Sequence, residues 1–206
     1  MNIPRPLGER FREALDYAAT LHQTQARKGT DIPYIAHLVA VAAIVLEYGG
    51  DEDQAIAALL HDAIEDQGGD ATRQEIRRRF GERVVTMVND CTDAEEEPKP
   101  AWKKRKLAYI AHVGSADKSS LLISMADKLH NSTAIVRDYR REGAQVFERF
   151  EPEREEVAWY YRSLVEAFDA RGFESDAKAL LEELKLAVGE LERCAGEGGD
   201  GEPEDR

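Results

Sequence analysis

A run of small aliphatic residues that ends in four ionisable side chains constrains this fold more than any other segment. The stretch reads Ala57-Ala58-Leu59-Leu60-His61-Asp62-Ala63-Ile64-Glu65-Asp66. Its aliphatic part belongs in a protein core, whereas buried carboxylates and imidazoles cost free energy unless they are paired, hydrogen-bonded or bound to a metal. The segment therefore predicts a buried helix that carries a polar site, and that site needs partners elsewhere in the chain.

Apolar residues recur at helical spacing along almost the whole chain, which predicts an all-α fold. Asp51 and Gln54 form a capping box before the helix of the opening segment, which we expect to end near Gly68-Gly69. Thr72 and Glu75 form the same pattern before a short helix that Gly81 closes. Further helices are expected over residues 11–21, 34–48, 103–110, 121–131, 152–171 and 175–192.

Length and charge limit the classes of protein to be considered. At 206 residues the chain suits one domain, which we place at residues 1–193, before a disordered acidic tail at 194–206. The net charge of −13 argues against a nucleic-acid-binding surface. No apolar run approaches the roughly 20 residues of a membrane span. Cys91 and Cys194 fit no metal or redox spacing, so we expect a cytoplasmic protein with reduced thiols.

The opening segment can share a metal ion with two other parts of the chain. His61 and Glu65 lie one helical turn apart, as do Asp62 and Asp66, so they form one broad polar face. The other imidazole and carboxylate come from His37 and from Asp127, which interrupts an aliphatic run. A lone buried histidine is more often a hydrogen-bonded core residue, but the joint occurrence favours a site. Mixed nitrogen and oxygen ligands suit Mn²⁺, Fe²⁺, Co²⁺ or Zn²⁺.

Five segments together resemble HD-domain phosphohydrolases, in particular the hydrolase of RelA/SpoT proteins and the single-domain small alarmone hydrolases of the metazoan SpoT-homologue type. The segments occur in the family's order over roughly residues 10 to 170. They are Arg27-Lys28, Pro33-Tyr34-Ile35-Ala36-His37, the opening segment, Ile76-Arg77-Arg78-Arg79-Phe80-Gly81 and Met125-Ala126-Asp127-Lys128-Leu129-His130-Asn131. The His-Asp pair alone is typical of a superfamily, whereas the combined set is specific.

The resemblance implies an all-α HD-domain helical bundle that hydrolyses guanosine 3′,5′-bis(diphosphate) alarmones. Such an enzyme removes the 3′-pyrophosphate and releases GDP or GTP, usually with Mn²⁺, although another divalent transition metal is possible. Glu65 and Asp66 would orient or deprotonate the attacking water. The metal ligands implied by position are His37, His61, Asp62 and Asp127.

The resemblance also implies contacts to a small-molecule nucleotide substrate. Arg27 would stack its guanidinium on the base, and Lys28 would meet phosphate. Tyr34 would shape the base pocket, and Asn131 would form a hydrogen bond near the ribose. The oligomeric state is left open.

The chain departs from the bifunctional enzymes of this family at the base side. The loop before Tyr34 is one residue longer than in those enzymes, and Ala134 stands where they typically carry threonine. An adenosine alarmone therefore remains an alternative substrate. The same residues would also suit a phosphohydrolase for another nucleotide, such as a 5′-nucleotidase, or a nucleotide sensor that does not hydrolyse.

Several polar and aromatic residues lie outside the predicted metal and substrate sites. The basic cluster at residues 103–106 is interpreted mainly as a solvated helix face. The alternative is that one or two of its members, for example Lys106, face the pyrophosphate. Arg149 and Tyr160 are candidates for the pocket rim. His130 is expected to form a hydrogen bond in the core or to support Asp127. His22 and His112 are interpreted as structural or surface residues, and Trp102 and Trp159 as packing residues.

Overall fold

The computed structural model describes residues 7–93 and 98–196, and both ranges are helical, as the apolar spacing predicts. The elements are α1 (Glu9–Leu21), α2 (Ile35–Glu47), α3 (Glu52–Leu60), α4 (Ala63–Asp66), α5 (Gly69–Phe80), α6 (Glu82–Cys91), α7 (Trp102–Val113), α8 (Lys118–Glu142), the 3-10 helix η1 (Gly143–Arg149), α9 (Arg154–Asp169) and α10 (Ser175–Gly196). Within these ranges the only β-type pairing is one isolated bridge between Ala26 and Pro33. The predicted all-α fold is confirmed.

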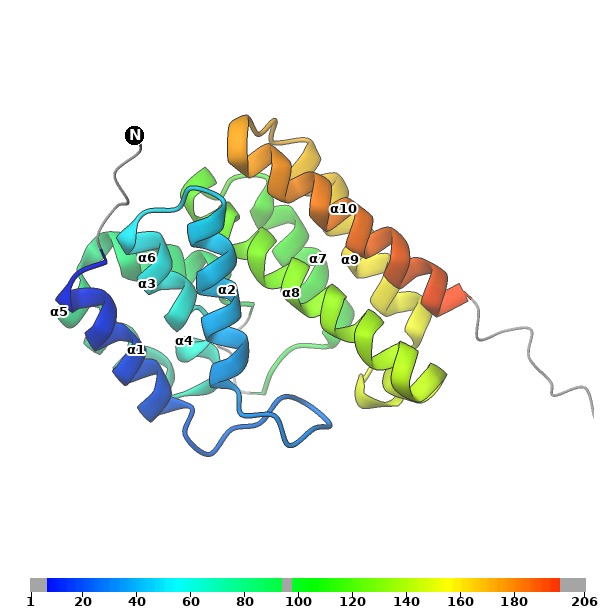
Figure 1. Ribbon diagram of the computed structural model, residues 1–206, viewed down its shortest axis with the longest axis horizontal. Coiled ribbons are helices and arrows are strands. Elements are labelled where there is room, and N and C mark those ends of the chain that lie inside the picture. The colour runs from blue at the N-terminus through cyan, green and yellow to red at the C-terminus, as the bar shows by residue number, and fades with distance from the viewer. Residues whose placement is uncertain (1–6, 94–97, 197–206) are drawn as a thin grey trace, which may run out of the picture.

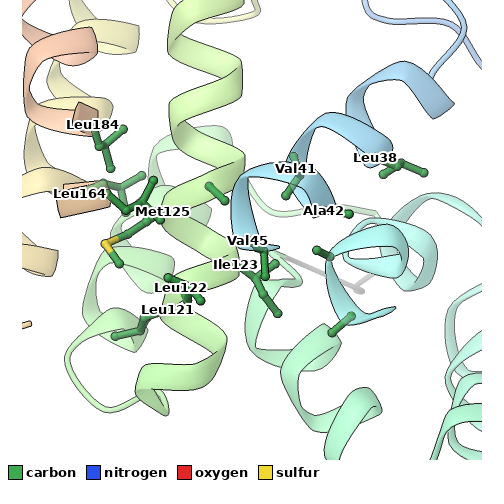
Figure 2. Packing of buried hydrophobic residues seen from close by; sticks show 14 of the residues in the cluster. Leu38, Val41, Ala42, Val45, Leu121, Leu122, Ile123, Met125, Leu164 and Leu184 are labelled. Atoms are coloured by element: carbon green, nitrogen blue, oxygen red, sulfur yellow. The ribbon is translucent and has the colours of Figure 1, made fainter. Parts of the chain in front are cut away.

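Helix α8 runs through the middle of the bundle (Figure 1). It packs against α2, α3 and α6 on one side and against α9 and α10 on the other. Figure 2 shows Met125 beside Leu164 of α9 and Leu184 of α10, whereas Ile123 lies toward Val45 of α2. Every residue from Ser120 to Asp127 is buried, so this part of α8 lies in the interior and carries polar groups there.

Helix α3 begins as the sequence predicts. The Asp51 side chain accepts a hydrogen bond from Gln54 N at 3.0 Å, and the Gln54 side chain accepts one from Asp51 N at 3.0 Å. This capping box satisfies two backbone donors that the first turn of a helix leaves unpaired. Every residue from Gln54 to Leu60 is buried, so α3 is the central helix of the N-terminal half.

The predicted continuous helix through the opening segment is wrong. Helix α3 ends at Leu60, and a separate four-residue turn, α4, begins at Ala63. The imidazole Nδ1 of His61 bonds the carbonyl of Ala58 at 2.7 Å, the acceptor that the N–H of Asp62 would use in a continuous helix. Such side-chain bonds compete with the backbone hydrogen bonds of a helix, so the helix is interrupted here and the side chain of Asp62 takes a different direction.

Three helix boundaries also differ from the predictions. Helix α5 begins at Gly69, so Thr72 lies inside the helix and its hydroxyl donates to the Gln67 carbonyl instead of capping. Helix α9 begins at Arg154, two residues after Pro152. Helix α10 continues to Gly196, beyond the predicted start of the acidic tail, and residues 197–206 of that tail lie outside the described residues.

None of the helices in the described ranges combines the length and the apolar character that crossing a membrane requires.

Candidate active site

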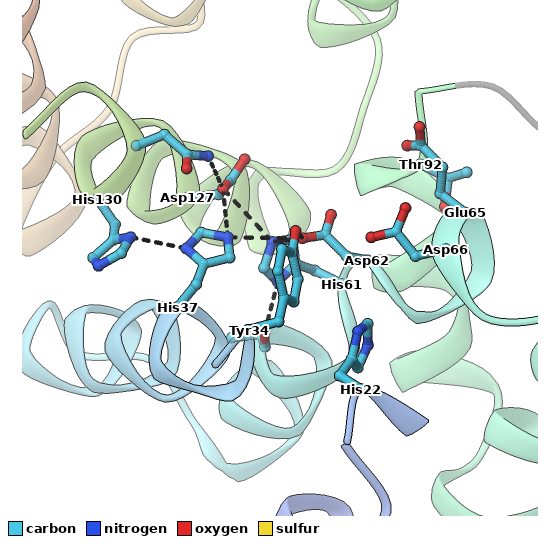
Figure 3. Close-up of polar contacts among 12 residues, drawn as sticks. His22, Tyr34, His37, His61, Asp62, Glu65, Asp66, Thr92, Asp127 and His130 are labelled. Carbon is cyan, nitrogen blue, oxygen red and sulfur yellow. Dashed lines mark hydrogen bonds and ion pairs between the residues drawn. The ribbon is translucent and has the colours of Figure 1, made fainter. Parts of the chain in front are cut away.

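The four predicted metal ligands come together from three elements (Figure 3). His37 projects from α2, His61 and Asp62 from the turn between α3 and α4, and Asp127 from α8. The Nε2 atom of His37 lies 3.2 Å from Asp127 Oδ1. The Nε2 atom of His61 lies 3.1 Å from Asp62 Oδ2. Two imidazole nitrogens and two carboxylate oxygens therefore converge on one point.

Both converging imidazole nitrogens lack a conventional partner. Nε2 of His37 and Nε2 of His61 are buried and form no hydrogen bond within the described residues. Together with a carboxylate oxygen of Asp127 they form a group in which all ligand atoms lie within 4.8 Å of one another. Because a buried unpaired nitrogen costs free energy, a divalent cation fits this donor set.

The opposite edge of each imidazole is fixed by a hydrogen bond. His61 Nδ1 donates to the Ala58 carbonyl, which aims its Nε2 at the carboxylates of the cluster. His37 Nδ1 lies 2.8 Å from Nδ1 of His130. Burial and the neighbouring His37 lower the pKa of His130 to about 4, so at neutral pH His130 is uncharged and can accept from His37. Of the two roles expected for His130, the structure shows the hydrogen bond, which goes to the buried His37, and not the support of Asp127.

The two carboxylates are held ionised. Burial acts to raise the pKa of Asp127, but Lys128 at 2.5 Å and the two imidazoles outweigh it, and the pKa lies well below the usual range. Burial likewise opposes ionisation of Asp62, but the facing imidazoles overcome it and hold the pKa of Asp62 well below its usual range. Ionised carboxylates are the form that binds a metal ion.

Tyr34 touches the ligand set directly. Its hydroxyl donates to Asp62 Oδ2 at 2.6 Å, a contact that the sequence did not indicate. Its ring also lines a cavity beside the cluster, where the sequence places it. Tyr34 therefore contacts both the wall of this cavity and Asp62, one of the predicted metal ligands.

Two cavities adjoin the cluster and share Tyr34 and Asn131 in their walls. The larger cavity, of about 350 Å³, also contains Arg27 and Lys28 of the predicted nucleotide contacts. Arg27 donates to Asn131 Oδ1 at 2.5 Å, and Asn131 in turn donates to Asp127 Oδ1 at 2.5 Å. All four predicted substrate-binding residues thus lie around one space next to the ligands.

Two residues whose position the sequence could not decide, Ala134 and Arg149, also line the larger cavity. Ala134 lines it, so the position that carries threonine in the related enzymes does face the cavity. Arg149 also lines it and lies 2.9 Å from the buried carboxylate of Asp138. The side chain of Arg149 packs against Gly29, where a Cβ atom would come within 2.6 Å of it. Arg149 thereby fixes the loop that carries Arg27 and Lys28.

The smaller cavity, of about 180 Å³, is strongly polar and contains both Asp62 and Asp127. Its basic residues are Arg105, Lys106 and Lys128. Asp93 accepts from Arg105 at 2.6 Å and from Lys106 at 2.7 Å.

Only part of this basic wall could be found in the sequence. Arg105 and Lys106 belong to the basic cluster of which one or two members were expected here, and Tyr160 was a rim candidate, whereas Asp93 and Lys128 were missed. The position of Lys128, directly after Asp127, is the signal that could have found it.

Lys103, another member of the basic cluster, does not line the smaller cavity. Lys103 sits over the ring of Trp159, with its Nζ 3.2 Å from the ring centre. It also pairs with Glu156 at 3.3 Å. The packing role expected for Trp159 is therefore combined with a cation–π contact.

The two candidate proton-handling carboxylates occupy different positions. Glu65 lines the smaller cavity, pairs with Lys99 at 2.9 Å and accepts from the backbone N–H of Asp93. Asp66 accepts from Gln25 at 2.8 Å and lines neither of these cavities within the described residues. Burial and the charge of Asp62 raise the pKa of Asp66. Figure 3 places Asp66 between Asp62 and Glu65.

The buried His/Asp cluster in an all-helical bundle defines a class of protein. The HD domain family matches residues 14–157, and the chain belongs to this family.

Within the family, the chain is similar to guanosine-3′,5′-bis(diphosphate) 3′-pyrophosphohydrolase MESH1 of Xenopus tropicalis, with 38% identity over 63% of this chain and 69% of that protein. The Drosophila melanogaster MESH1 is 35% identical over 59% of this chain and 67% of its own length. The enzyme of that activity from Aquifex aeolicus is 35% identical, but the match covers only 17% of it. A solved structure described as a metazoan orthologue of SpoT that hydrolyses ppGpp has a TM-score of 0.69 and 28% identity, covering 92% of this chain and 99% of that one.

Proposed function

We propose that the chain is a metal-dependent hydrolase that removes the 3′-pyrophosphate of guanosine 3′,5′-bis(diphosphate), in its tetra- and pentaphosphate forms, to give GDP or GTP and pyrophosphate. The observation that carries this proposal is the meeting of two cavities at the His/Asp cluster. A substrate that bridges them would place its nucleoside in the larger cavity and its 3′-pyrophosphate in the smaller one. The names of the similar proteins support the same activity.

The residues that would hold the metal are His37, His61, Asp62 and Asp127. Their nitrogen and oxygen donors suit Mn²⁺, and another divalent transition metal would also fit. The bound ion would polarise a phosphoryl oxygen and lower the pKa of a water molecule. The protein itself contributes the fixed orientation of both imidazoles and the two ionised carboxylates.

The smaller cavity supplies the charge that a departing pyrophosphate requires. Lys128 is held fully charged beside Asp127, because that carboxylate keeps the lysine pKa well above its usual value, and Arg105 and Lys106 share the same wall. In the reaction the water oxygen bonds to the phosphorus next to the 3′ oxygen, the bond from that phosphorus to the 3′ oxygen breaks, and the 3′ oxygen takes a proton. Glu65 lines this cavity and is placed to handle the proton of the water, with Asp66 beside it.

The larger cavity would hold the nucleoside and its 5′-phosphates. Arg27 lies over the Tyr34 ring with its guanidinium carbon 5.7 Å from the ring centre, so a planar base can stack on this pair. Lys28 is available for phosphate in the same wall. Since nucleotides of this kind arise inside the cell, a cytoplasmic location is part of the proposal.

Incubation of the purified chain with guanosine tetraphosphate and Mn²⁺ tests the activity. The expected products are GDP and pyrophosphate in equal amounts, separated by ion-exchange chromatography. Release of orthophosphate alone, or no turnover of any alarmone, contradicts the proposal.

Asp62→Ala tests the ligand assignment. The substitution removes one metal-facing oxygen and leaves the Tyr34 hydroxyl without its acceptor. We expect turnover to fall below detection while the helical circular dichroism spectrum stays unchanged. Asp70→Ala, on the exposed face of α5, is the matched control and keeps full activity. An Asp62→Ala variant with wild-type turnover contradicts the assignment.

A second candidate substrate is favoured by one observation. Ala134 contributes no hydroxyl group at its position in the wall of the larger cavity, so an adenosine alarmone also fits. Turnover of guanosine and adenosine alarmones and of 5′-nucleotides, compared side by side, separates these substrates. Binding without any turnover would instead indicate a nucleotide sensor.

A further inference from the structure

His22 lies directly after α1 and is only 2% exposed, although it contacts none of the four metal ligands through a hydrogen bond. It is close to the site nevertheless, as Figure 3 shows, beneath Tyr34 and Asp66. Two separate contacts connect it to the reaction centre. One is a hydrogen-bonded path to Asp66, and the other is a stacked ring on Tyr34.

The hydrogen-bonded path runs through Gln25. The side-chain amide of Gln25 donates to Asp66 Oδ2 at 2.8 Å, so its carbonyl oxygen points the other way. That oxygen accepts from the amide of Gln67 at 2.6 Å and lies 2.7 Å from Nδ1 of His22. Because the oxygen can only accept, Nδ1 of His22 must carry the proton and donate.

The stacked ring forms the second path. The imidazole of His22 lies nearly parallel to the Tyr34 ring, with centroids 5.2 Å apart and an interplanar angle of 18°. The Tyr34 hydroxyl donates to Asp62 Oδ2. His22 therefore contacts the groups that hold Asp62, in the turn between α3 and α4, and Asp66, at the end of α4.

A role in packing alone does not explain this histidine. Its Nε2 is buried and has no hydrogen-bond partner within the described residues. Leaving such an atom unpaired costs free energy, and an apolar side chain of similar shape would avoid that cost. What an apolar side chain cannot supply is the Nδ1–H that orients Gln25.

We infer that His22 is a positioning residue for the reaction, which acts through Gln25 to hold the carboxylate of Asp66 beside the metal cluster. The inference rests on the proposed function, because Asp66 receives its role in catalysis there. The ring stack on Tyr34 is a weaker second contribution, since it fixes a ring that its own bond to Asp62 also holds.

Two substitutions separate the hydrogen bond from the stacked ring. His22→Phe keeps an aromatic ring and loses the donor, whereas His22→Asn keeps a donor near the position of Nδ1 and loses the ring. For His22→Phe we expect kcat for the guanosine alarmone to fall by about 10- to 100-fold, the effect typical of groups that orient active-site residues, with KM unchanged. His22→Asn should recover most of kcat.

The outcomes that overturn the inference are equally specific. A His22→Phe variant with wild-type kcat would show that the hydrogen bond to Gln25 has no role in the reaction. Equal losses of kcat in His22→Phe and His22→Asn indicate packing alone. His112→Phe is the matched control, because His112 pairs with Asp90 on α6 and should keep full activity.

A measurement without turnover separates this inference from the proposed function. The melting temperatures of His22→Phe, Asp66→Ala and the double variant form a cycle, in which coupled residues give non-additive changes. Non-additive changes support the connection, and additive changes overturn it. If the wild-type chain turns over no alarmone, the proposed function fails, whereas the cycle still decides whether His22 and Asp66 are coupled.

Discussion

Single side chains decide the charge inside the reaction centre. The side chain of Lys128 is only 15% exposed beside Asp127. Partial burial acts to lower the pKa of Lys128, but the attraction of that carboxylate prevails and keeps the pKa well above the usual value. A lysine that stays charged with little exposure to water is available to an anionic leaving group. The same enclosed space keeps a different group, the thiol of Cys91, in its neutral form.

The thiol of Cys91 should be unreactive despite its position in the wall of the smaller cavity. Burial raises its pKa, and the negative charge of Asp127 adds to this against the opposing effect of Lys128. A raised pKa lowers the thiolate fraction, which is the reactive form. At pH 8 we expect iodoacetamide to label Cys91 far more slowly in the folded chain than in urea, measured by mass spectrometry. Equal rates in the two states contradict the raised pKa.

Ala134 should set part of the base preference. It is buried in the wall of the larger cavity, and Ala134→Thr adds one hydroxyl there. One additional hydrogen bond is worth about 0.5–1.5 kcal/mol, so the ratio of kcat/KM for guanosine over adenosine alarmones should change about 2- to 12-fold. Ala134→Val has nearly the shape of threonine without the hydroxyl and should leave the ratio unchanged. The same ratio in the threonine and valine variants counts against a base contact.

At the scale of elements, the turn between α3 and α4 gives the site its geometry. Adjacent residues on a continuous helix point about 100° apart, which would separate His61 from Asp62. The interruption after Leu60 allows both side chains to face the same point, with His61 Nε2 3.1 Å from Asp62 Oδ2. The orientation of this turn depends on α3, and α3 depends on its N-terminal cap.

Asp51→Ala should destabilise α3 by about 1 kcal/mol, the usual cost of a lost N-terminal cap. Burial acts to raise the pKa of Asp51, but bonds from Arg83 and Gln54 outweigh it and lower the pKa. A lowered pKa in the folded state means that the contribution is present above the unfolded pKa of about 3.9 and is lost as the pH falls below it.

Urea unfolding at pH 7 and at pH 3 measures this contribution. The difference between the wild type and Asp51→Ala should shrink at pH 3. Asp51→Asn retains a capping oxygen without the charge, so its loss relative to the wild type should be smaller than that of Asp51→Ala at pH 7 and should shrink further at pH 3. A difference for Asp51→Ala that is the same at both pH values contradicts the assignment.

At the scale of the whole molecule, the distribution of charge matters more than its total. The chain carries a net charge of −13, yet both cavities have basic residues in their walls. Among the described residues, the wall of the larger cavity carries four basic residues and one carboxylate, so its field can attract an anionic nucleotide to an acidic protein, whereas the basic residues of the smaller cavity are paired with carboxylates. The predicted metal ligands come from α2, the α3–α4 turn and α8, so a bound ion would link three parts of the bundle that are far apart in the chain.

Removal of the metal should therefore destabilise the whole bundle. An ion that binds only the folded state adds about 2.7 kcal/mol of stability at a concentration 100 times its Kd. We expect EDTA to lower the melting temperature and Mn²⁺ to restore it, measured by calorimetry. His61→Ala should show no response to either. A wild-type melting temperature that neither EDTA nor Mn²⁺ changes contradicts the site.

The sequence by itself predicted the all-helical fold and grouped the four candidate ligands, because both predictions follow from local physics. Apolar spacing specifies a buried face whatever the fold, and Asp127 inside an aliphatic run requires a buried partner. The capping box at Asp51 depends only on residues three positions apart, which is why it was predictable.

Only the tertiary structure decided how these parts are connected. The break after Leu60, the basic wall containing Arg105 and Lys128, and the path from His22 through Gln25 to Asp66 all depend on contacts between segments far apart in the chain. Such contacts are set by the angles and distances at which helices pack, and no local pattern encodes them. The sequence could therefore name the ligands, whereas their orientation and supporting groups required the packed bundle.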